Sequence, residues 1–179
     1  IDSDGVSARA LTLNLNGAEA ESITADVIFG NDTADTLGAS NPLGAISITG
    51  DLDLNAAITS AASLVVSGTS NLGANVTTSG TQTYTVAVTF SSATVTLTTT
   101  NSDVTFGVPV NSDAGQTRNL PINTGGTTGT IQFGGFVGNT VGLGAISITG
   151  NLDLDANIVD AASLAVSGTS NLGDNVTTS

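Results

Sequence analysis

Large aliphatic residues alternate with small or polar ones along most of the chain, and no stretch of 11 or more residues has a helical period. Thr81–Phe90 and Asp103–Val110 are the longest alternating stretches, and Leu11–Leu15 is a shorter one. Such alternation predicts half-buried β-strands, and threonine suits their exposed side because it is β-branched. We predict an all-β protein with Thr81–Phe90 as one strand. Its inward residues would be Tyr84, Val86, Val88 and Phe90.

One stretch of the chain occurs twice. Leu43–Ser79 (block 1) and Leu143–Ser179 (block 2) are identical at 30 of 37 positions, at an offset of 100 residues. The differing positions, in the numbering of block 1, are 51, 55, 57, 59, 60, 65 and 74. None of them is one of the regularly spaced large aliphatic residues. A fixed long period of this kind is typical of a repeat architecture.

A shorter period lies inside each block. Ile46 is followed 18 positions later by Leu64, and Ile58 by Val76, and block 2 repeats the pattern. One turn of a β-solenoid takes about this many residues, and its coils stack like residues on like. We therefore predict a right-handed parallel β-solenoid (β-helix) with about 18–22 residues per coil, about five coils per 100-residue unit and about nine coils in all.

An alternative fold is a string of immunoglobulin-like β-sandwiches. One such domain has about 100 residues, which is close to the long period. The 18-residue subperiod and the absence of a core tryptophan favour the solenoid over this alternative.

The long period also divides the chain into two units of one continuous solenoid. Ile1–Leu11 aligns without gaps with Val110–Leu120, whereas Leu43 aligns with Leu143, so the offset between the units falls from 109 to 100. The units are residues 1–109 and residues 110–179, the second of them truncated; between Arg9 and Leu43 the first has nine more residues than the second has between Arg118 and Leu143, so we expect an extra loop within residues 14–42. Because the first residue aligns inside a repeat, we expect the chain to be a fragment of a longer one.

Composition narrows the functions that the chain can have. It has a net charge of −13, no histidine, no cysteine and only two basic residues, both arginine. Nucleic acids and anionic lipids both need basic contacts, so neither is an expected partner. No apolar run is long enough to insert into a membrane. Without histidine, cysteine or lysine the usual nucleophile–base pairs cannot form, and the few aromatic residues do not suit a sugar-cleaving cleft. We predict that the chain is not an enzyme.

Several aspartates are candidate metal ligands. Two carboxylates two residues apart on the outer side of one strand can share a hard cation such as calcium, and an acidic turn weakly resembles a calcium-binding repeat turn. The candidate ligands are Asp32, Asp35, Asp51, Asp53, Asp153 and Asp155. The alternative is that these residues form an ordinary solvated surface, which is the usual place of aspartate.

Two further patterns involve surface residues. Arg9 and Arg118 each follow an aspartate, Asp4 or Asp113, by five positions, which indicates either a repeated ion pair at a corner of the coil or two unpaired surface arginines. Acceptor triplets for N-glycosylation begin at Asn31, Asn75 and Asn175, although such triplets are expected by chance in a threonine-rich chain.

The chain resembles a known family in four of its motifs. These are SDxxxxRxL, TTGTIQFGGFVGN, GTQTYTVAVTF and TLTTTNSDVTFGVPVNSDAG. They are similar to the β-strand repeats of giant secreted bacterial surface proteins, the filamentous-haemagglutinin-like β-solenoid adhesins. The resemblance covers essentially the whole chain, and it implies a right-handed parallel β-helix that is exported to the cell surface as a stalk, fibre or adhesin.

These observations predict a structural repeat segment of a long secreted fibre or of an extracellular, biofilm-type matrix. Its expected partners are neighbouring repeats of the same chain, or identical subunits end to end. The alternative function is an adhesin module that binds a host-cell receptor or a glycan through loops and is stabilised by calcium.

Overall fold

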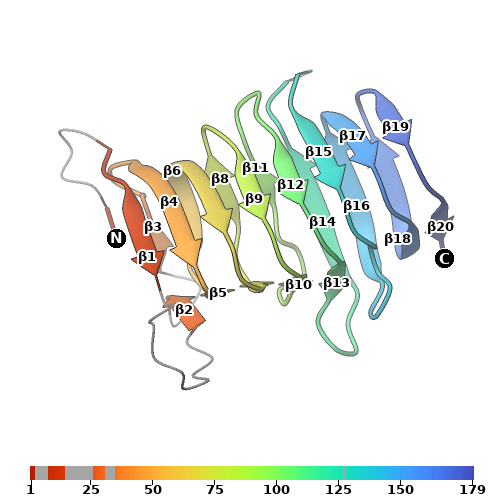
Figure 1. Ribbon diagram of the computed structural model, residues 1–179, viewed down its shortest axis with the longest axis horizontal. Helices are drawn as coiled ribbons and strands as arrows, with labels where there is room; N and C mark the ends of the chain where they lie inside the picture. Colours follow the sequence, from red (N-terminus) through yellow and green to blue (C-terminus); the bar gives the residue numbers. More distant parts are fainter. Residues whose placement is uncertain (3–7, 15–25, 31–34, 127) are drawn as a thin grey trace.

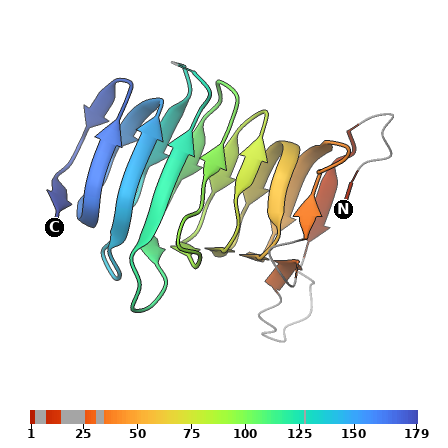
Figure 2. The ribbon, with the colours of Figure 1, turned by 180° about the vertical axis from the view of Figure 1, so that it is seen from behind.

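The chain folds into a stack of coils around one long axis, as a computed structural model shows (Figure 1). The structure describes residues 1–2, 8–14, 26–30, 35–126 and 128–179. The two chain ends lie at opposite ends of the stack, and the view from behind shows the same succession of coils (Figure 2). Strand pairing in the described residues is parallel throughout. The predicted parallel β-solenoid is therefore confirmed.

The described residues contain 20 strands and no helix. The strands are β1 (Leu11–Asn14), β2 (Asp26–Phe29), β3 (Thr36–Leu37), β4 (Leu43–Thr49), β5 (Asp51–Leu54), β6 (Ala57–Val66), β7 (Ser70–Leu72), β8 (Val76–Thr78), β9 (Gln82–Tyr84), β10 (Val88–Phe90), β11 (Leu97–Thr98), β12 (Val104–Phe106), β13 (Val110–Ser112), β14 (Arg118–Asn123), β15 (Thr130–Phe133), β16 (Leu143–Thr149), β17 (Asn151–Leu154), β18 (Ile158–Val166), β19 (Ser170–Leu172) and β20 (Val176–Thr178). Most are short, because the chain soon turns a corner onto the next side of the coil.

The strands stack into three ladders, one on each side of the coil. Face 1 consists of β1, β4, the end of β6, β9, β12, β15, β17 and β19. Face 2 consists of β2, β5, β7, β10, β13, Val137, the start of β18 and β20. Face 3 consists of β3, the start of β6, β8, β11, β14, β16 and the end of β18. Because β6 and β18 each run around a corner, faces 1 and 3 and the strand β20 form one 15-stranded sheet, whereas β2, β5, β7, β10 and β13 form a separate five-stranded sheet on face 2.

The stack has about seven turns, so the prediction of about nine was too high. Successive positions on face 1 are Ile46, Leu64, Gln82, Val104, Ile131, Leu152 and Ser170. Turns inside the blocks therefore have the expected length, whereas those between the blocks are longer, because corner loops lengthen them. The first turn, from Leu11 to Ile46, is longer still. It contains the region of the predicted extra loop, part of which lies outside the described residues.

The corners correct the prediction of a single strand over Thr81–Phe90. The strand β9 ends at Tyr84 and β10 begins at Val88, on the next face of the coil. Val86 lies at the corner between them and is 38% exposed, whereas Tyr84 and Phe90 are fully buried. Apolar alternation continues through the corner, so the sequence pattern does not reveal that the chain changes direction there.

The core is a set of inward side chains stacked coil on coil. Most are aliphatic, as predicted, and those of block 1, such as Ile46, Leu54 and Leu64, are fully buried. On face 1 an aromatic stack replaces them in three successive turns. The ring centroids of Tyr84 and Phe106 are 5.3 Å apart, and those of Phe106 and Phe133 are 5.2 Å apart, with nearly parallel planes. The parallel ladder sets this separation, because adjacent strands lie about 4.8 Å apart.

Equivalent glycines make one corner of each unit. Gly38 and Gly138 have φ angles of 75° and 72°, a region that residues with a side chain rarely adopt. A Cβ atom on Gly138 would also lie 2.0 Å from the carbonyl oxygen of Asp160 in the next turn. Each of these corners therefore depends on glycine for both backbone conformation and space.

The two blocks lie on different faces of the solenoid. Leu52 pairs with Val27 and Ser70 on face 2, whereas its equivalent Leu152 pairs with Ile131 and Ser170 on face 1. From a residue of block 1 to its equivalent in block 2 the chain makes four whole turns and then passes on by two more faces. We had predicted five whole coils. The longer turns between the blocks cause the difference. The surface of block 2 is consequently rotated by one face relative to that of block 1.

Candidate functional site: outward aspartate and asparagine ladders

The predicted calcium ligands lie in three separate parts of the chain. Asp51 and Asp53 lie on β5 of face 2, whereas Asp153 lies on β17 of face 1, shortly before Asp155 at a corner. Asp35 lies just before β3, and Asp32 lies outside the described residues. Among the residues that the structure describes, no group of three or more acidic side chains could hold a metal ion.

The block 1 carboxylates have partners within the protein. Asp51 Oδ1 accepts a hydrogen bond of 2.6 Å from the backbone N–H of Thr69 in the next turn. Asp53 Oδ1 accepts one of 2.9 Å from Asn71 Nδ2, also in the next turn, and Asp53 Oδ2 accepts one of 3.2 Å from Asn55 Nδ2. These side chains therefore connect successive coils along the outside of the sheet.

Block 2 repeats the two hydrogen bonds between turns, one of them with an uncharged acceptor. Asn151 replaces Asp51, and its Oδ1 accepts a hydrogen bond of 3.0 Å from the N–H of Thr169. Asp153 accepts one of 2.7 Å from Asn171, as Asp53 does from Asn71. Because an amide oxygen replaces a carboxylate oxygen with the same partner, the function of this position is to accept a hydrogen bond rather than to carry charge.

Replacing Asp51 tests this interpretation. We expect Asp51→Asn to change the free energy of unfolding by no more than about 0.5 kcal/mol, as typical surface substitutions do. Asp51→Ala removes the acceptor of the Thr69 N–H and should cost about 1–2 kcal/mol. Urea unfolding of both variants measures the difference. Equal losses in the two variants would show that the charge matters, contrary to the natural Asn151.

The same connection recurs at other corners. Asn75 Oδ1 accepts from the N–H of Thr96 at 2.8 Å, and Asp103 Oδ1 accepts from the N–H of Thr130 at 2.8 Å. Further acceptors of backbone N–H groups one turn later are Asn111, Asn119 and Asn157. Hydrogen bonds of this kind leave fewer unpaired backbone donors at irregular corners, where the strand ladders are interrupted.

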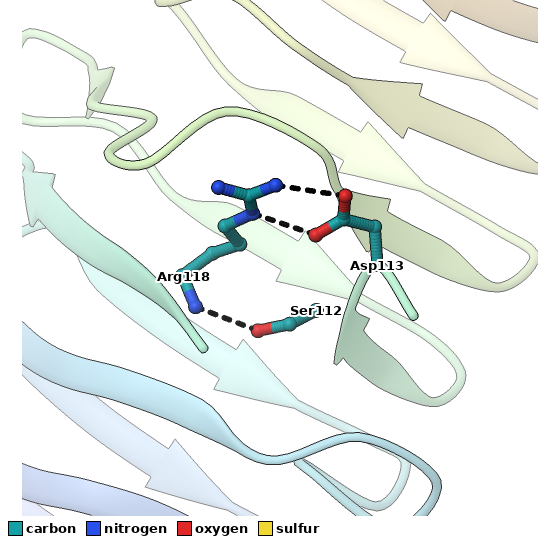
Figure 3. Close-up of polar contacts among 3 residues, drawn as sticks. All are labelled: Ser112, Asp113 and Arg118. Carbon is teal, nitrogen blue, oxygen red and sulfur yellow. Dashed lines mark hydrogen bonds and ion pairs between the residues drawn. The ribbon is translucent and has the colours of Figure 1, made fainter. Parts of the chain in front are cut away.

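The predicted ion pair of the second unit is present. Arg118 donates from Nε to Asp113 Oδ1 at 2.6 Å and from an Nη atom to Asp113 Oδ2 at 2.8 Å, which closes the loop between β13 and β14 (Figure 3). Ser112 Oγ accepts from the N–H of Arg118. The hydrogen bond from Arg118 is the main reason why the pKa of Asp113 lies below its usual value. The pair therefore stabilises the loop at neutral pH and weakens as pH falls through that lowered pKa.

The equivalent Asp4, the predicted partner of Arg9, lies outside the described residues.

Inside the coil, one polar network was not predicted from the sequence. Gln82 is fully buried and donates from Nε2 to the carbonyl oxygen of Thr98 at 2.9 Å and to that of Val76 at 3.2 Å. Tyr84 OH donates to Gln82 Oε1 at 3.3 Å. Burial raises the pKa of Tyr84 well above its usual value. The network connects face 1 to face 3 through the core, because Thr98 and Val76 lie on strands of face 3.

One buried hydroxyl has no partner among the described residues. Ser70 is 2% exposed, and its Oγ accepts or donates no hydrogen bond. It lies in the inward column of face 2 between Leu52 and Val88. An unpaired buried polar group destabilises the folded state by about 1–3 kcal/mol.

Removing this hydroxyl should stabilise the protein. We expect Ser70→Ala to raise the free energy of unfolding by about 1 kcal/mol, measured by urea unfolding. The chain contains its own control, since the equivalent Ser170 is exposed and Ser170→Ala should have no measurable effect. A loss of stability in Ser70→Ala would mean that the hydroxyl has a partner.

The first described turns contain a cavity of about 280 Å³. Its lining residues are Ile1, Ile28, Phe29, Gly30, Asp35, Thr36, Leu37 and Ala56. Ile28 is 62% exposed, which makes it one of the most exposed large apolar residues described. The cavity lies in the long first turn, next to the region of the predicted extra loop.

Comparisons with known proteins do not assign a family. No family model, curated protein or solved structure matches the chain. The resemblance to filamentous-haemagglutinin-like adhesins therefore stays a prediction, while its coarser part, a β-helix repeat protein, agrees with the structure. No helix in the described part of the chain is long and apolar enough to cross a membrane.

Proposed function

We propose that this chain is a structural segment of a long extracellular fibre, in which the solenoid forms the shaft and performs no catalysis. The observation that supports this most strongly is that inward and outward side chains alike connect one turn to the next. The core stacks column by column, and the outward Asp and Asn side chains bond to the following turn. Such a structure can lengthen by adding turns without changing its cross-section.

The charge of the chain suits this role. With a net charge of −13, neighbouring shafts repel one another. Coils that stack along the axis are also held by hydrogen bonds between the backbones of their strands, which shafts lying side by side do not form. The charge therefore opposes side-by-side association more than it opposes stacking. The expected partners are therefore further coils along the axis, from the same chain or from identical subunits.

Microscopy of the producing cells tests the proposal. An antibody raised against this chain should label fibres outside the cell, and cryo-EM of those fibres should show an axial repeat of about 4.8 Å, the spacing of β-strands. Labelling confined to the cell interior, or fibres made of beads without that axial repeat, would contradict it.

A second candidate function is an adhesin module that binds a host receptor or a glycan through loops. The observation that favours it is the cavity beside the exposed Ile28 in the long first turn. Ile28→Asn should then abolish attachment to cells or to a glycan array. Val86→Asn, at another exposed apolar residue, is the control that should leave attachment unchanged. Equal attachment by Ile28→Asn and the unsubstituted chain would contradict the adhesin function.

Calcium binding is part of this second candidate function. If Asp53, Asp153 or their neighbours bind it, millimolar calcium should raise the melting temperature by several degrees over that in chelator, because a ligand that binds only the folded state stabilises it. Magnesium at the same concentration is the control for ionic strength. Equal melting temperatures in calcium and in chelator would contradict calcium binding.

A further inference from the structure

The outward side chains of face 3 differ from those of the other two faces. Faces 1 and 2 both carry outward aspartates, for example Asp153 on face 1 and Asp53 on face 2. The outward residues of face 3 form two columns along the axis. Column A runs through Asn75, Thr96, Pro121, Ser147 and Ala165, and column B runs through Thr77, Thr98, Asn123 and Thr149. Every member of these columns is uncharged, in a chain with a net charge of −13.

Both columns are regular and open to solvent. Adjacent strands of face 3 pair in parallel, so the members of a column recur at the strand spacing of about 4.8 Å. On β16 the outward Ser147 and Thr149 are exposed, whereas the inward residues that alternate with them are buried. The aspartates on either side of the face, such as Asp103 and Asp113, lie at corners of the coil. Face 3 is therefore an uncharged surface with carboxylates at its borders.

Several polar groups of this face already have hydrogen-bond partners within it. Asn75 Oδ1 accepts from the N–H of Thr96 at 2.8 Å, and Asn119 Oδ1 accepts from the N–H of Ala145 at 2.9 Å. Covering such groups costs little, because the large penalty falls on polar groups that are buried without a partner. A sugar is bound through polar groups that are free to pair with it. The face therefore suits an opposing sheet, as in a β-sandwich, better than it suits a glycan.

We propose that face 3 is a lateral pairing surface, through which two copies of this chain associate side by side. A contact through face 1 or face 2 would bring the outward carboxylates of two acidic chains together. Face 3 against face 3 keeps those carboxylates away from the partner, and the centres of protein interfaces are depleted of charged residues. Because both copies use the same face, the contact closes as a pair and does not continue into a bundle. The pairing goes beyond the proposed fibre, since it needs only two chains in solution.

The area of face 3 makes the pair weak for a chain of this length. A stack of about seven turns extends roughly 30 Å along the axis, and five residues of a strand span roughly 13 Å. The contact therefore covers about 400 Å² of each copy, about half of a standard interface. We expect single and paired chains in an equilibrium that depends on concentration. Salt should favour the pair, because it screens the repulsion between the charges on the other faces.

Sedimentation velocity at a series of concentrations measures this equilibrium. Raising the ionic strength from about 0.01 M to about 1 M, which shortens the Debye length from about 30 Å to about 3 Å, should strengthen pairing. At the higher ionic strength Ser147→Asp should weaken pairing at least about tenfold, because it brings like charges together inside the contact. The matched control is Thr105→Asp, which adds the same charge to the outside of face 1. It should change the dissociation constant by less than about twofold, because exposed charges are screened. Circular dichroism checks that both variants fold.

Cross-linking shows which face makes the contact. The chain has no cysteine, so Ser147→Cys and Thr105→Cys each introduce a unique thiol. A flexible bis-maleimide should link Ser147→Cys chains into covalent pairs several times faster than Thr105→Cys chains.

Four results would overturn the proposal: single chains under all conditions, pairing that weakens as salt rises, equal effects of the two aspartate variants, or equal cross-linking of the two cysteine variants. Binding of single chains to a neutral polysaccharide, lost in Ser147→Asp, would overturn it in favour of a glycan partner.

Discussion

Replacing Phe106 with alanine is expected to lower the free energy of unfolding by about 3–5 kcal/mol, the usual cost of removing a buried aromatic side chain. Phe106 is fully buried and is the middle ring of a stack, with Tyr84 on one side and Phe133 on the other. Truncation therefore leaves two rings without their stacking partner. The coils cannot close the gap, because backbone bonds such as Gly107 N–H to Tyr84 O and Gly134 N–H to Phe106 O hold them at a fixed separation.

Urea unfolding measures this loss, with the fluorescence of Tyr84, the sole tyrosine, as the signal. Phe136→Ala is the matched control, since Phe136 is 44% exposed at a corner of the coil. The control should cost less than about 1 kcal/mol. Similar losses in the two variants would contradict the assignment of Phe106 to the interior and Phe136 to the surface.

Raising the pH above 10 is expected to destabilise the protein by about 1.4 kcal/mol per pH unit. Burial raises the pKa of Tyr84 far above its usual value of about 10. Above pH 10 the unfolded chain therefore loses the phenol proton while the folded chain keeps it. Because the unfolded state then binds fewer protons, stability is complete below pH 10 and falls as pH rises.

The composition of the chain leaves few other groups that could titrate in this pH range. With no lysine, histidine or cysteine, Tyr84 is the sole side chain expected to titrate between about pH 9 and 12. Tyrosinate absorbance should appear only together with unfolding. Tyr84→Phe should abolish the alkaline loss, although it leaves Gln82 Oε1 without its donor and costs about 1–3 kcal/mol at neutral pH. Reversible ionisation of Tyr84 in the folded protein would contradict its burial.

The stacking of coils within a block could be predicted from the sequence, because each coil there has the same length. Ile46 lies beside Leu64, and Ile58 beside Val76, as the 18-residue period indicated. The same residues also show a finer spacing that sequence reasoning missed. Ile46, Leu52, Ile58 and Leu64 follow one another at every sixth position, which divides each coil of the block into three equal faces.

The rotation of block 2 could not be predicted, since it depends on coil lengths that the sequence pattern does not show. Corner loops such as residues 113–117 add length without interrupting the inward columns, because the strands on each side of them pair as before. The positions of the candidate calcium ligands depend on the same coil lengths. Carboxylates at equivalent positions of the two blocks, such as Asp53 and Asp153, project from different faces.

Disulfide formation across one pair of strands tests most directly whether equivalent blocks lie on different faces of one solenoid. Gln132 and Asp153 are direct neighbours on face 1, so the double variant Gln132→Cys and Asp153→Cys should form an intramolecular disulfide under mild oxidation. Asp53→Cys with Asn71→Cys, neighbours within block 1, is the positive control. Cross-linking of both pairs is the expected result. Cross-linking of the control pair alone would mean that block 2 is not rotated onto face 1, and would contradict this arrangement of coils.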